Sequence, residues 1–449
     1  MAKHSQSPPS EAARRPTTGD RRGVIKAVRG TRDLLPPDTA LWNFVEAAAR
    51  DVFRVYHYHE IRTPVIEDLA LFQRSVGEET DIVGKEMFAW QDRGRGESEK
   101  GQWLALRPEN TAGVVRAYIE HKLWERPGLQ KLYYMGPQFR RERPQKGRYR
   151  QFYQIGAEAI GPPSAGSESP AVDAEVIEML VTLLERLGIQ GWILELNSIG
   201  CVHDRPRYHE ALRKALKPVA AKMCADCQRR AVTNPLRVFD CKVEADQPII
   251  AKLPRITDYL DEGCRTHFSQ VQDLLRALDI PFTLKPTLVR GIDYYDRTAW
   301  EFTHGALGAQ NAIVGGGRYD GLSEALGGPA APGIGFAIGE DRLVLALEET
   351  AGAIVKPADA YIAPLGAGMN REAALLAREL RRHDLVIEMG DESFRLKKSL
   401  ETASKLGARF AIIVGENEVR SGEYALKSLA TGEQVTVPRA ELPRRLQAK

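Results

Sequence analysis

The sequence predicts a mixed α/β fold, in which an α+β core carries a helical insertion and is followed by a C-terminal α/β domain. Helix-like and strand-like segments alternate up to residue 158, and strands with glycine-rich turns return over residues 282–336. Between them, residues 201–268 are helical in character, charged and poor in β-branched runs. Beyond residue 357, β-α units repeat, which is typical of a small parallel-type sheet with helices on its faces.

Length and composition are those of an ordinary soluble protein. A chain of 449 residues is long enough for two or three domains, and 43% of its residues are hydrophobic and 27% charged. The net charge of +3 creates no global field, so any nucleic-acid surface must be local. No apolar run is long enough to span a membrane and no secretory signal is visible, which predicts a cytoplasmic protein without a membrane partner.

Residues 1–23 are expected to form a disordered tail, because they are rich in Pro, Ser, Ala and Arg. A transit peptide is the alternative. Glu11 and Asp20 argue against it, since such peptides avoid acidic residues.

The core, expected over residues 24–350, begins with an amphipathic helix over residues 38–56. The extended segment HEIRTPVIED follows, and its Pro64 indicates a sheet edge or an interface. A second helix is expected over residues 171–187, after a loop rich in Gly, Pro and Ser, and an apolar strand over residues 192–196.

The most informative segment is FRRERPQKGRYRQFYQIGAE, residues 139–158, which reads as two strands joined by a basic turn. Strand side chains alternate, so Phe152, Gln154, Gly156 and Glu158 share one face. In order along the strand, that face carries an aromatic ring, an amide, the space left by a glycine and a carboxylate. It is about 20 Å long at strand rise, the length of a nucleotide joined to a small amino acid. We therefore predict that it is the floor of a binding site.

The turn of this hairpin offers groups that bind phosphate or nucleic acid. Arg140 can hold a phosphate bidentately, and Glu142 can orient a neighbouring group or a metal. Arg143, Gln145 and Arg148 suit ATP phosphates or the end of a nucleic acid. A solvated basic hairpin is the alternative, which the unusual face behind the turn disfavours.

The segment LRPENTAG, residues 106–113, also contains a group of polar residues. Asn110 or Thr111 is expected to cap the next helix. Glu109 beside Thr111 additionally suits an ammonium group, which requires carboxylate and hydroxyl acceptors.

Two later segments combine glycine with charged and phenolic side chains. LVRGIDYY brings Arg290, Tyr294 and Tyr295 close together along the chain, and VGGGRYDGL contains Tyr319. GIGFAIGEDRL places small residues on a strand before Arg342 at a helix start, so a nucleotide could lie flat against that strand.

The five cysteines fit a reducing compartment better than a disulfide framework. Cys224 and Cys227 form a C-x-x-C, and Cys241 and Cys264 follow. These four could bind a structural zinc ion, but the later spacings are loose for a zinc ribbon. Ordinary reduced thiols are the expected state, and no metal site is assigned.

These strings resemble the histidyl-tRNA synthetases, a family of class II synthetases, from about residue 24 to the C-terminus. The segment around Pro64 is similar to class II motif 1, which builds the dimer interface in that class. FRRE with its turn and strand resembles motif 2, and GIGFAIGEDRL resembles motif 3. LVRGIDYY and GGGRYDGL resemble the two histidine-specific motifs of the family. The resemblance implies a class II synthetase-type antiparallel sheet flanked by helices, and an anticodon-binding domain over residues 357–449.

The resemblance also implies roles for individual residues. The catalytic residues would be Arg290 and Arg140, both beside the ATP α-phosphate. The ATP-binding residues would be Arg140, Glu142, Arg148, Phe152, which stacks on adenine, and Arg342, which holds the γ-phosphate. The histidine-binding residues would be Glu109, Thr111, Gln154, Glu158, Tyr294, Tyr295 and Tyr319, with Glu158 and Tyr295 bracketing the imidazole. Arg143 and Gln145 would face the acceptor end of tRNA.

The function implied is that of a histidine–tRNA ligase acting as a homodimer. It would activate L-histidine with ATP to histidyl-adenylate and pyrophosphate, with Mg²⁺, and transfer histidine to the 3′ end of tRNA(His). One alternative is a non-catalytic regulatory subunit of ATP phosphoribosyltransferase, against which the retained Arg140, Arg290 and Arg342 argue. Another is a synthetase for a different amino acid. Glu158 with Tyr295 argues against it, because a carboxylate and a phenol match the N–H and lone pair of a neutral imidazole.

Overall fold

The computed structural model describes residues 24–77, 80, 82–92, 101–145, 147–307, 311–348 and 357–447. They belong to two compact units, which divide between Ala351 and Gly352. The expected tail, residues 1–23, lies outside the described residues. None of the helices in the described ranges is long and apolar enough to cross a membrane.

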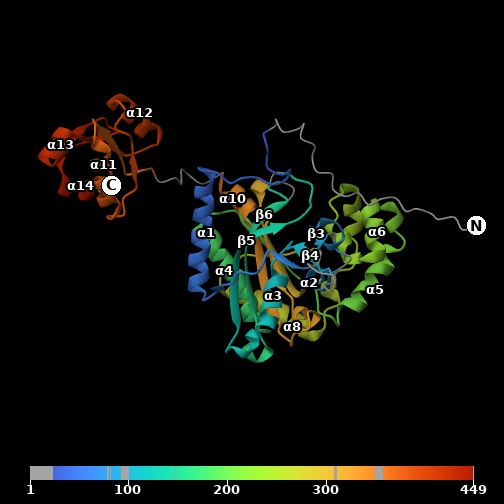
Figure 1. Ribbon diagram of the computed structural model, residues 1–449. Helices are drawn as coiled ribbons and strands as arrows, with labels where there is room; N and C mark the ends of the chain where they lie inside the picture. The colour runs from blue at the N-terminus through green and yellow to red at the C-terminus, as the bar shows by residue number, and fades with distance from the viewer. Residues whose placement is uncertain are drawn as a thin grey trace, which may run out of the picture. The chain divides into compact units, whose positions relative to one another are not determined.

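The first unit is built on an eight-stranded sheet in the order β1-β5-β6-β11-β10-β9-β7-β8. Figure 1 labels its neighbouring strands β5 and β6. The strands are β1 (His59–Glu60), β5 (Gln130–Phe139), β6 (Gln151–Ile160), β7 (Trp192–Ser198), β8 (Thr283–Leu284), β9 (Asp296–His304), β10 (Ala312–Arg318) and β11 (Gly333–Gly339). The outer pairs β1–β5 and β7–β8 are parallel and the five inner pairs are antiparallel. The expected antiparallel sheet is confirmed.

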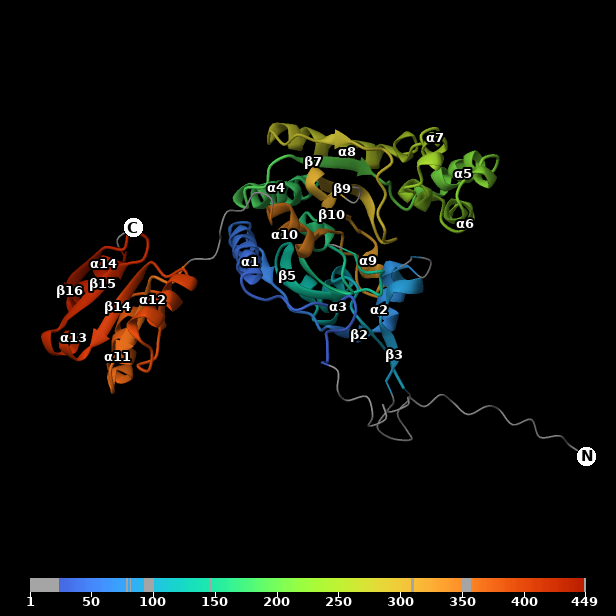
Figure 2. The ribbon, with the colours of Figure 1, turned by 90° about the horizontal axis from the view of Figure 1, so that it is seen from above.

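Four helices cover one face of this sheet and form the main core with it (Figure 2). They are α1 (Asp38–Val55), α4 (Pro170–Arg186), α8 (Glu262–Ala277) and α10 (Glu340–Glu348). On β6, Ile155, Ala157 and Ala159 point into this core. Because strand side chains alternate, Phe152, Gln154, Gly156 and Glu158 lie on the opposite face, as predicted.

The opposite face is covered by α3 (Thr111–Glu120), whose Val115 and Tyr118 pack with Ile160 of β6. Nearby lie α2 (Leu69–Val76), α9 (Leu322–Ala325) and a small sheet in the order β2-β4-β3. Its strands are β2 (Ile66–Asp68), β3 (Ala89–Gln91) and β4 (Trp103–Leu106).

The helical insertion has a small core of its own. It contains α5 (Arg205–Leu216), α6 (Ala225–Thr233), the 3₁₀ helices η5 (Pro235–Asp240) and η6 (Glu244–Asp246), and α7 (Gln247–Ile250). Figure 2 shows α5, α6 and α7 gathered at one end of the first unit. The expected end of the insertion, near residue 268, falls inside α8, whose Phe268, Val271 and Leu275 belong to the main core.

The second unit is a five-stranded sheet in the order β13-β12-β14-β15-β16 with its own core. The strands are β12 (Ala360–Leu365), β13 (Ile387–Met389), β14 (Phe410–Gly415), β15 (Glu423–Ser428) and β16 (Gln434–Pro438), and the helices are α11 (Met369–Arg381), α12 (Leu396–Lys405), α13 (Glu416–Ser421) and α14 (Leu442–Gln447). The repeated β-α units are confirmed. The sheet is parallel only from β13 to β14, since β15 and β16 pair antiparallel. The short connection through α13 cannot make the crossover that a parallel partner needs.

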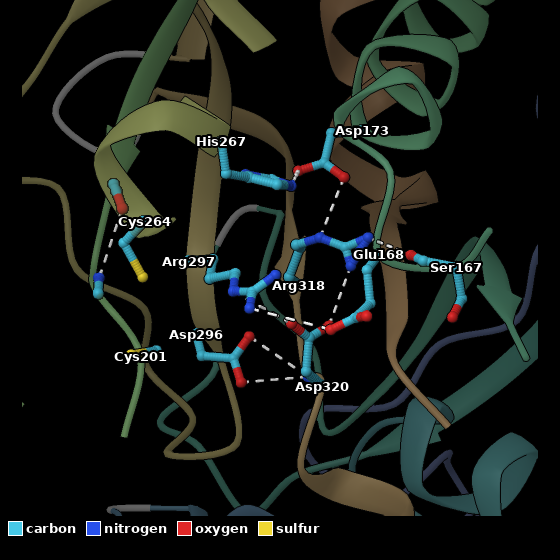
Figure 3. A network of polar contacts seen from close by, with 12 residues as sticks. Ser167, Glu168, Asp173, Cys201, Cys264, His267, Asp296, Arg297, Arg318 and Asp320 are labelled. Atoms are coloured by element: carbon cyan, nitrogen blue, oxygen red, sulfur yellow. Dashed lines mark hydrogen bonds and ion pairs between the residues drawn. The ribbon is translucent and has the colours of Figure 1, made fainter. Parts of the chain in front are cut away.

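A buried network of charged groups fixes the end of β10 to α4 (Figure 3). Arg318, which is fully buried, forms ion pairs with Asp173 at 3.1 Å and Asp320 at 2.9 Å, and donates to the Ser167 carbonyl. Burial raises the pKa of Asp173 to about 6. The ring of His267, 3.6 Å from Asp173, is neutral because burial lowers its pKa to about 3. Arg318 and Asp320 flank Tyr319, so the network fixes the position of that phenol.

We expect Arg318→Met to destabilise the first unit by about 3–5 kcal/mol, because it leaves the fully buried Asp173 carboxylate without its cation, whereas Asp320 keeps an ion pair with Arg297. The matched control is Arg54→Met, which removes a surface pair with Asp51 whose side chains are 73% and 66% exposed. That control should change stability by less than about 1 kcal/mol. Chemical denaturation of the full chain measures both. Equal losses of unfolding free energy in the two variants would show that the buried network contributes no more to stability than a surface ion pair.

Candidate active site

A pocket of about 220 Å³ lies beside the β5–β6 hairpin. All five residues expected to bind ATP line it: Arg140, Glu142, Arg148, Phe152 and Arg342. Gln154, Arg290, Glu301 and Asp341 also contribute to its lining. On β11, the small residues Gly335, Ala337 and Gly339 pair with Glu158, Gly156 and Gln154, so the face of β6 is not obstructed from that side.

Positive charge is concentrated at the hairpin end of this pocket. The Arg140 guanidinium lies 5.2 Å from the Phe152 ring centroid, and its Nε donates to the Pro108 carbonyl at 2.9 Å. Glu142 lies between Arg140 at 3.8 Å and Arg148 at 3.0 Å. Burial and the nearby charge of Arg148 lower the pKa of Arg342. An anion bound here would therefore reduce the repulsion between neighbouring cations.

Arg290 lies across the glycines of β10. Its Nη1 forms an ion pair with Glu301 Oε1 at 2.7 Å, and its guanidinium lies 5.2 Å from the Tyr295 ring centroid. A Cβ on Gly315 would come within 2.3 Å of the guanidinium, and one on Gly317 within 2.8 Å of the Tyr295 ring. The glycine run of VGGGRYDGL therefore provides the space in which these two side chains lie.

Two polar atoms at the pocket are buried and lack a hydrogen-bond partner among the described residues. They are the Nε of Arg290, a donor, and the Oε1 of Gln154, an acceptor. Buried polar groups are normally paired, so an unpaired donor and an unpaired acceptor at one pocket indicate a ligand that supplies both partners.

Glu158 is the centre of a second group of polar side chains, further along β6. It is fully buried and accepts hydrogen bonds from Thr111 Oγ1 and Tyr319 Oη, both at 2.6 Å, and from Tyr134 Oη at 3.4 Å. A Cβ on Gly335 would lie 1.7 Å from Glu158 Oε2, so only glycine fits there. Burial raises the pKa of Glu158 to about 8, although the hydroxyl donors oppose that rise.

Glu109 caps α3, a role that the sequence predicted for Asn110 or Thr111. Its carboxylate accepts from the backbone N–H groups of Thr111 at 2.7 Å and Ala112 at 3.1 Å, at the start of α3. Asn110 occupies the N-cap position, as predicted for one of the two residues. Its side chain, however, accepts from Thr63 Oγ1 at 2.6 Å, and the Thr111 hydroxyl donates to Glu158, so neither side chain makes the cap hydrogen bond. Burial raises the pKa of Glu109 as well. The Tyr294 hydroxyl lies 3.4 Å from Glu109, which links LVRGIDYY to this group.

The predicted residues thus form two adjoining groups. Gln154 and Arg290 line the pocket beside the β5–β6 hairpin. Hydrogen bonds join the second group, which lies beside that pocket and consists of Glu109, Thr111, Glu158, Tyr294 and Tyr319. The ring of Tyr295 lies between the Arg290 guanidinium and the ring of Tyr294, and the centroids of the two tyrosine rings are 4.7 Å apart. The phenols that donate to Glu158 are those of Tyr319, at 2.6 Å, and Tyr134, at 3.4 Å. Arg143 and Gln145 lie apart, exposed on the turn and outside the pocket lining.

Sequence reasoning missed two residues of the site. Glu301, the ion-pair partner of Arg290, lies on β9 and looks like any strand carboxylate. Tyr134 lies over Gly156, where a Cβ would be 2.4 Å from its hydroxyl. The pairing of Tyr134 with Gly156 in the hairpin register was the signal that could have revealed it.

A basic groove of about 500 Å³ adjoins the pocket and shares Arg148, Glu301, Ala312 and Arg342 with it. The groove also contains Arg230, Arg237, Lys242 and Lys285, with Asp240 and Glu301 as its acidic residues. Most of these cations come from the helical insertion or the strands next to it. The groove therefore suits a polyanion that approaches the pocket from outside.

Comparison with known proteins agrees with this geometry. The family described as "Histidyl-tRNA synthetase" matches residues 30–343, and "Anticodon binding domain" matches residues 359–449. The histidine–tRNA ligase of Koribacter versatilis is 67% identical over 419 residues, which cover 93% of this chain and 95% of that protein. The enzyme of that name from Solibacter usitatus is 58% identical over 426 residues, or 95% of this chain and 99% of the relative.

A solved structure of similar fold supports the same assignment. Apo histidyl-tRNA synthetase of S. aureus has a TM-score of 0.77 and 36% identity, and the match covers 94% of this chain and 100% of that one. These findings confirm the predicted fold class and activity. The chain belongs to the histidyl-tRNA synthetases, the ATP-dependent ligases that attach histidine to tRNA.

Proposed function

We propose that the face of β6 that carries Phe152, Gln154 and Glu158 binds histidyl-adenylate along its length, with ATP at the hairpin end and histidine at the Glu158 end. The observation that carries this proposal is the order of groups along one strand. Phe152 and Gln154 line the cationic pocket, while Glu158 lies in the buried polar group beyond Gly156. Adenine stacks on Phe152, Arg140 holds the α-phosphate and Arg342 the γ-phosphate.

Activation joins the histidine carboxylate to the α-phosphate. One carboxylate oxygen attacks the α-phosphorus, and the bond to the bridging oxygen of pyrophosphate breaks. The carboxylate is already ionised, so no side chain has to remove a proton. Arg140 and Arg290 stabilise the negative charge that develops on the α-phosphate, and their effect comes from fixed placement. Arg290 is held for this role by Glu301 and by the ring of Tyr295.

When bound, Mg²⁺ would supply positive charge beside the ATP phosphates and the pyrophosphate. Glu142 and Glu301 are carboxylates in the pocket lining, and oxygen ligands of this kind suit Mg²⁺. The residues present therefore fit the ion.

Histidine is recognised by the group around Glu158. The α-ammonium group is held by Glu109, Thr111 and the unpaired Oε1 of Gln154. Glu158 and Tyr295 pair with the two imidazole nitrogens, and Tyr294 and Tyr319 complete the walls. An amino acid without these nitrogens would leave buried polar groups unpaired, so it would be rejected strongly.

The transfer step uses surfaces that the first step does not need. The 3′-hydroxyl of the terminal tRNA nucleotide attacks the histidyl carbonyl, and AMP leaves. The acceptor end reaches the adenylate past Arg143 and Gln145, with the basic groove holding its phosphates. Residues 357–449 bind the anticodon.

The enzyme acts as a cytoplasmic homodimer. On the small sheet, the side chains of Ile66, Trp90 and Trp103 are 49%, 37% and 51% exposed. Large apolar side chains exposed next to the motif 1-like segment support an interface with a second copy of the chain.

We expect deletion of residues 356–449 to spare histidine-dependent ATP–pyrophosphate exchange while reducing tRNA charging by about 10²–10⁴-fold, because one of two linked tRNA contacts is lost. Each unit has its own core, so the first should fold alone. Exchange and aminoacylation are measured on the same preparation. Charging that survived the deletion would refute the anticodon-binding role, whereas loss of exchange would refute the separate catalytic unit.

A further inference from the structure

The helical insertion brings three thiols and one carboxylate to a single point. Cys224, Cys227, Cys241 and Asp246 each offer one ligand atom, and these four atoms all lie within 4.8 Å of one another. Cys227, Cys241 and Asp246 are buried, and Cys224 is partly buried. This cluster belongs to the small core of the insertion, apart from the proposed binding sites for ATP and histidine.

The spacing of these atoms fits a tetrahedral metal. Around zinc, with Zn–S near 2.3 Å and Zn–O near 2.0–2.2 Å, two sulfurs lie about 3.8 Å apart and a sulfur and an oxygen about 3.5 Å apart. Here the Sγ atoms of Cys224 and Cys241 are 3.8 Å apart, and Cys241 Sγ lies 3.3 Å from Asp246 Oδ2. A cation bound between the two sulfurs would offset the repulsion between two thiolates at this distance.

Backbone groups around the cluster hold the ligands in position. The N–H of Val243 donates to Cys241 Sγ at 3.4 Å, and the N–H of Cys224 donates to Asp246 Oδ2 at 3.1 Å. Outer hydrogen bonds of this kind orient metal ligands. Cys224 is also the N-cap of α6, where the helix dipole favours a thiolate.

The fourth cysteine considered from the sequence belongs elsewhere. Cys264 lies near Cys201, Asp204 and Asp261, and Figure 3 shows both of these cysteines. In that second cluster the carboxylates serve the backbone. Asp204 accepts from the N–H groups of Cys201 at 3.1 Å and Asp261 at 2.7 Å, and Asp261 caps α8 through the N–H of Cys264 at 2.7 Å. We assign no ion to this second cluster. Its Cys264 therefore provides the matched control for the metal analysis.

We propose that Cys224, Cys227, Cys241 and Asp246 bind one structural Zn²⁺. Four protein ligands close the coordination shell, so the ion stabilises the fold and performs no chemistry. It ties the start of α6 to the segment after η5. That 3₁₀ helix carries Arg237, whose Nη1 donates to the backbone carbonyl of Arg290 at 3.2 Å. The ion would therefore stiffen the support of the Arg290 loop.

Metal analysis of the purified full-length protein tests this proposal. We expect about one zinc per chain, loss of that zinc in Cys227→Ser, and full retention in Cys264→Ser, which changes the second cluster. Absence of zinc from protein purified without chelators and supplied with Zn²⁺ would overturn the proposal. Equal loss in both variants would overturn it too.

Cobalt replacement gives a readout that does not depend on how well a variant folds. The unchanged protein, stripped with a chelator and given Co²⁺, should show the intense visible bands of a tetrahedral thiolate site, with one equivalent bound. Weak octahedral bands, or no uptake, would contradict the assignment. Asp246→Asn should keep the thiolate-to-cobalt charge-transfer band but weaken Co²⁺ binding, and an unchanged affinity would exclude Asp246 as a ligand.

Discussion

Replacing Arg290 by Ala should reduce histidine-dependent ATP–pyrophosphate exchange by at least about 10²–10³-fold, the usual effect of removing one fixed donor to a developing oxyanion. Arg290 is buried at the pocket, pairs with Glu301 at 2.7 Å and has an Nε without a protein partner among the described residues. These are the properties of a group held ready for a ligand. The loss should appear in kcat, because the charge that Arg290 stabilises develops during the reaction.

A structural explanation of that loss can be separated from a catalytic one. Arg290→Ala leaves the Glu301 carboxylate without its cation, which could disturb the pocket. In the double variant Arg290→Ala, Glu301→Gln, that charge is removed, so folding should be normal and exchange should stay low. Recovery of exchange in the double variant would show that Arg290 only neutralises Glu301.

Glu158→Gln should lower kcat/KM for histidine by at least about 10²-fold while leaving the KM for ATP nearly unchanged. The amide keeps the size of the side chain but places an N–H donor where we propose that the carboxylate accepts from imidazole, and mismatched polar groups in a buried site discriminate strongly. Exchange kinetics at varied histidine and varied ATP separate the two effects. A rise in the KM for ATP alone would show that Glu158 lies at the ATP end of the adenylate, which would contradict the proposed role.

The same substitution should stabilise the substrate-free protein at alkaline pH. Burial raises the pKa of Glu158 to about 8, above its value in the unfolded chain. Its favourable contribution to stability is therefore complete below the unfolded-state pKa of about 4.3 and is lost as pH rises to about 8. Each pKa unit corresponds to about 1.4 kcal/mol. The melting temperature of Glu158→Gln should exceed that of the unchanged protein at pH 9 and equal it near pH 4; a constant difference would contradict this titration.

The parts of the site that follow local rules could be predicted from the sequence. Alternation along a strand is enough to place Phe152, Gln154 and Glu158 on one face, and the structure confirms it. The small residues of GIGFAIGEDRL, which lie on β11, predicted room beside that strand, whereas the glycine run of β10 alone predicted nothing specific. The structure shows what approaches, namely Arg290 at Gly315 and Glu158 at Gly335.

The parts that depend on contacts between distant segments could not be predicted. The Arg290–Glu301 pair joins a loop to a strand, and nothing in either segment marks the other as its partner. Glu109 caps α3 from one residue further back than the usual rule considers. Cysteine spacing alone suggested Cys264, while the fold brings Asp246 to Cys241. β15 and β16 were not anticipated, because the β-α repeat ends after β14.

We propose that one face of β6 binds histidyl-adenylate along its whole length, from the adenine to the imidazole. The most direct test of this proposal is ATP–pyrophosphate exchange by the full-length protein with Mg²⁺ and each of the common amino acids in turn. We expect exchange that depends on histidine and is lost in both Arg290→Ala and Glu158→Gln. Exchange supported equally well by another amino acid, or histidine-dependent exchange that persists unchanged in both variants, would contradict it.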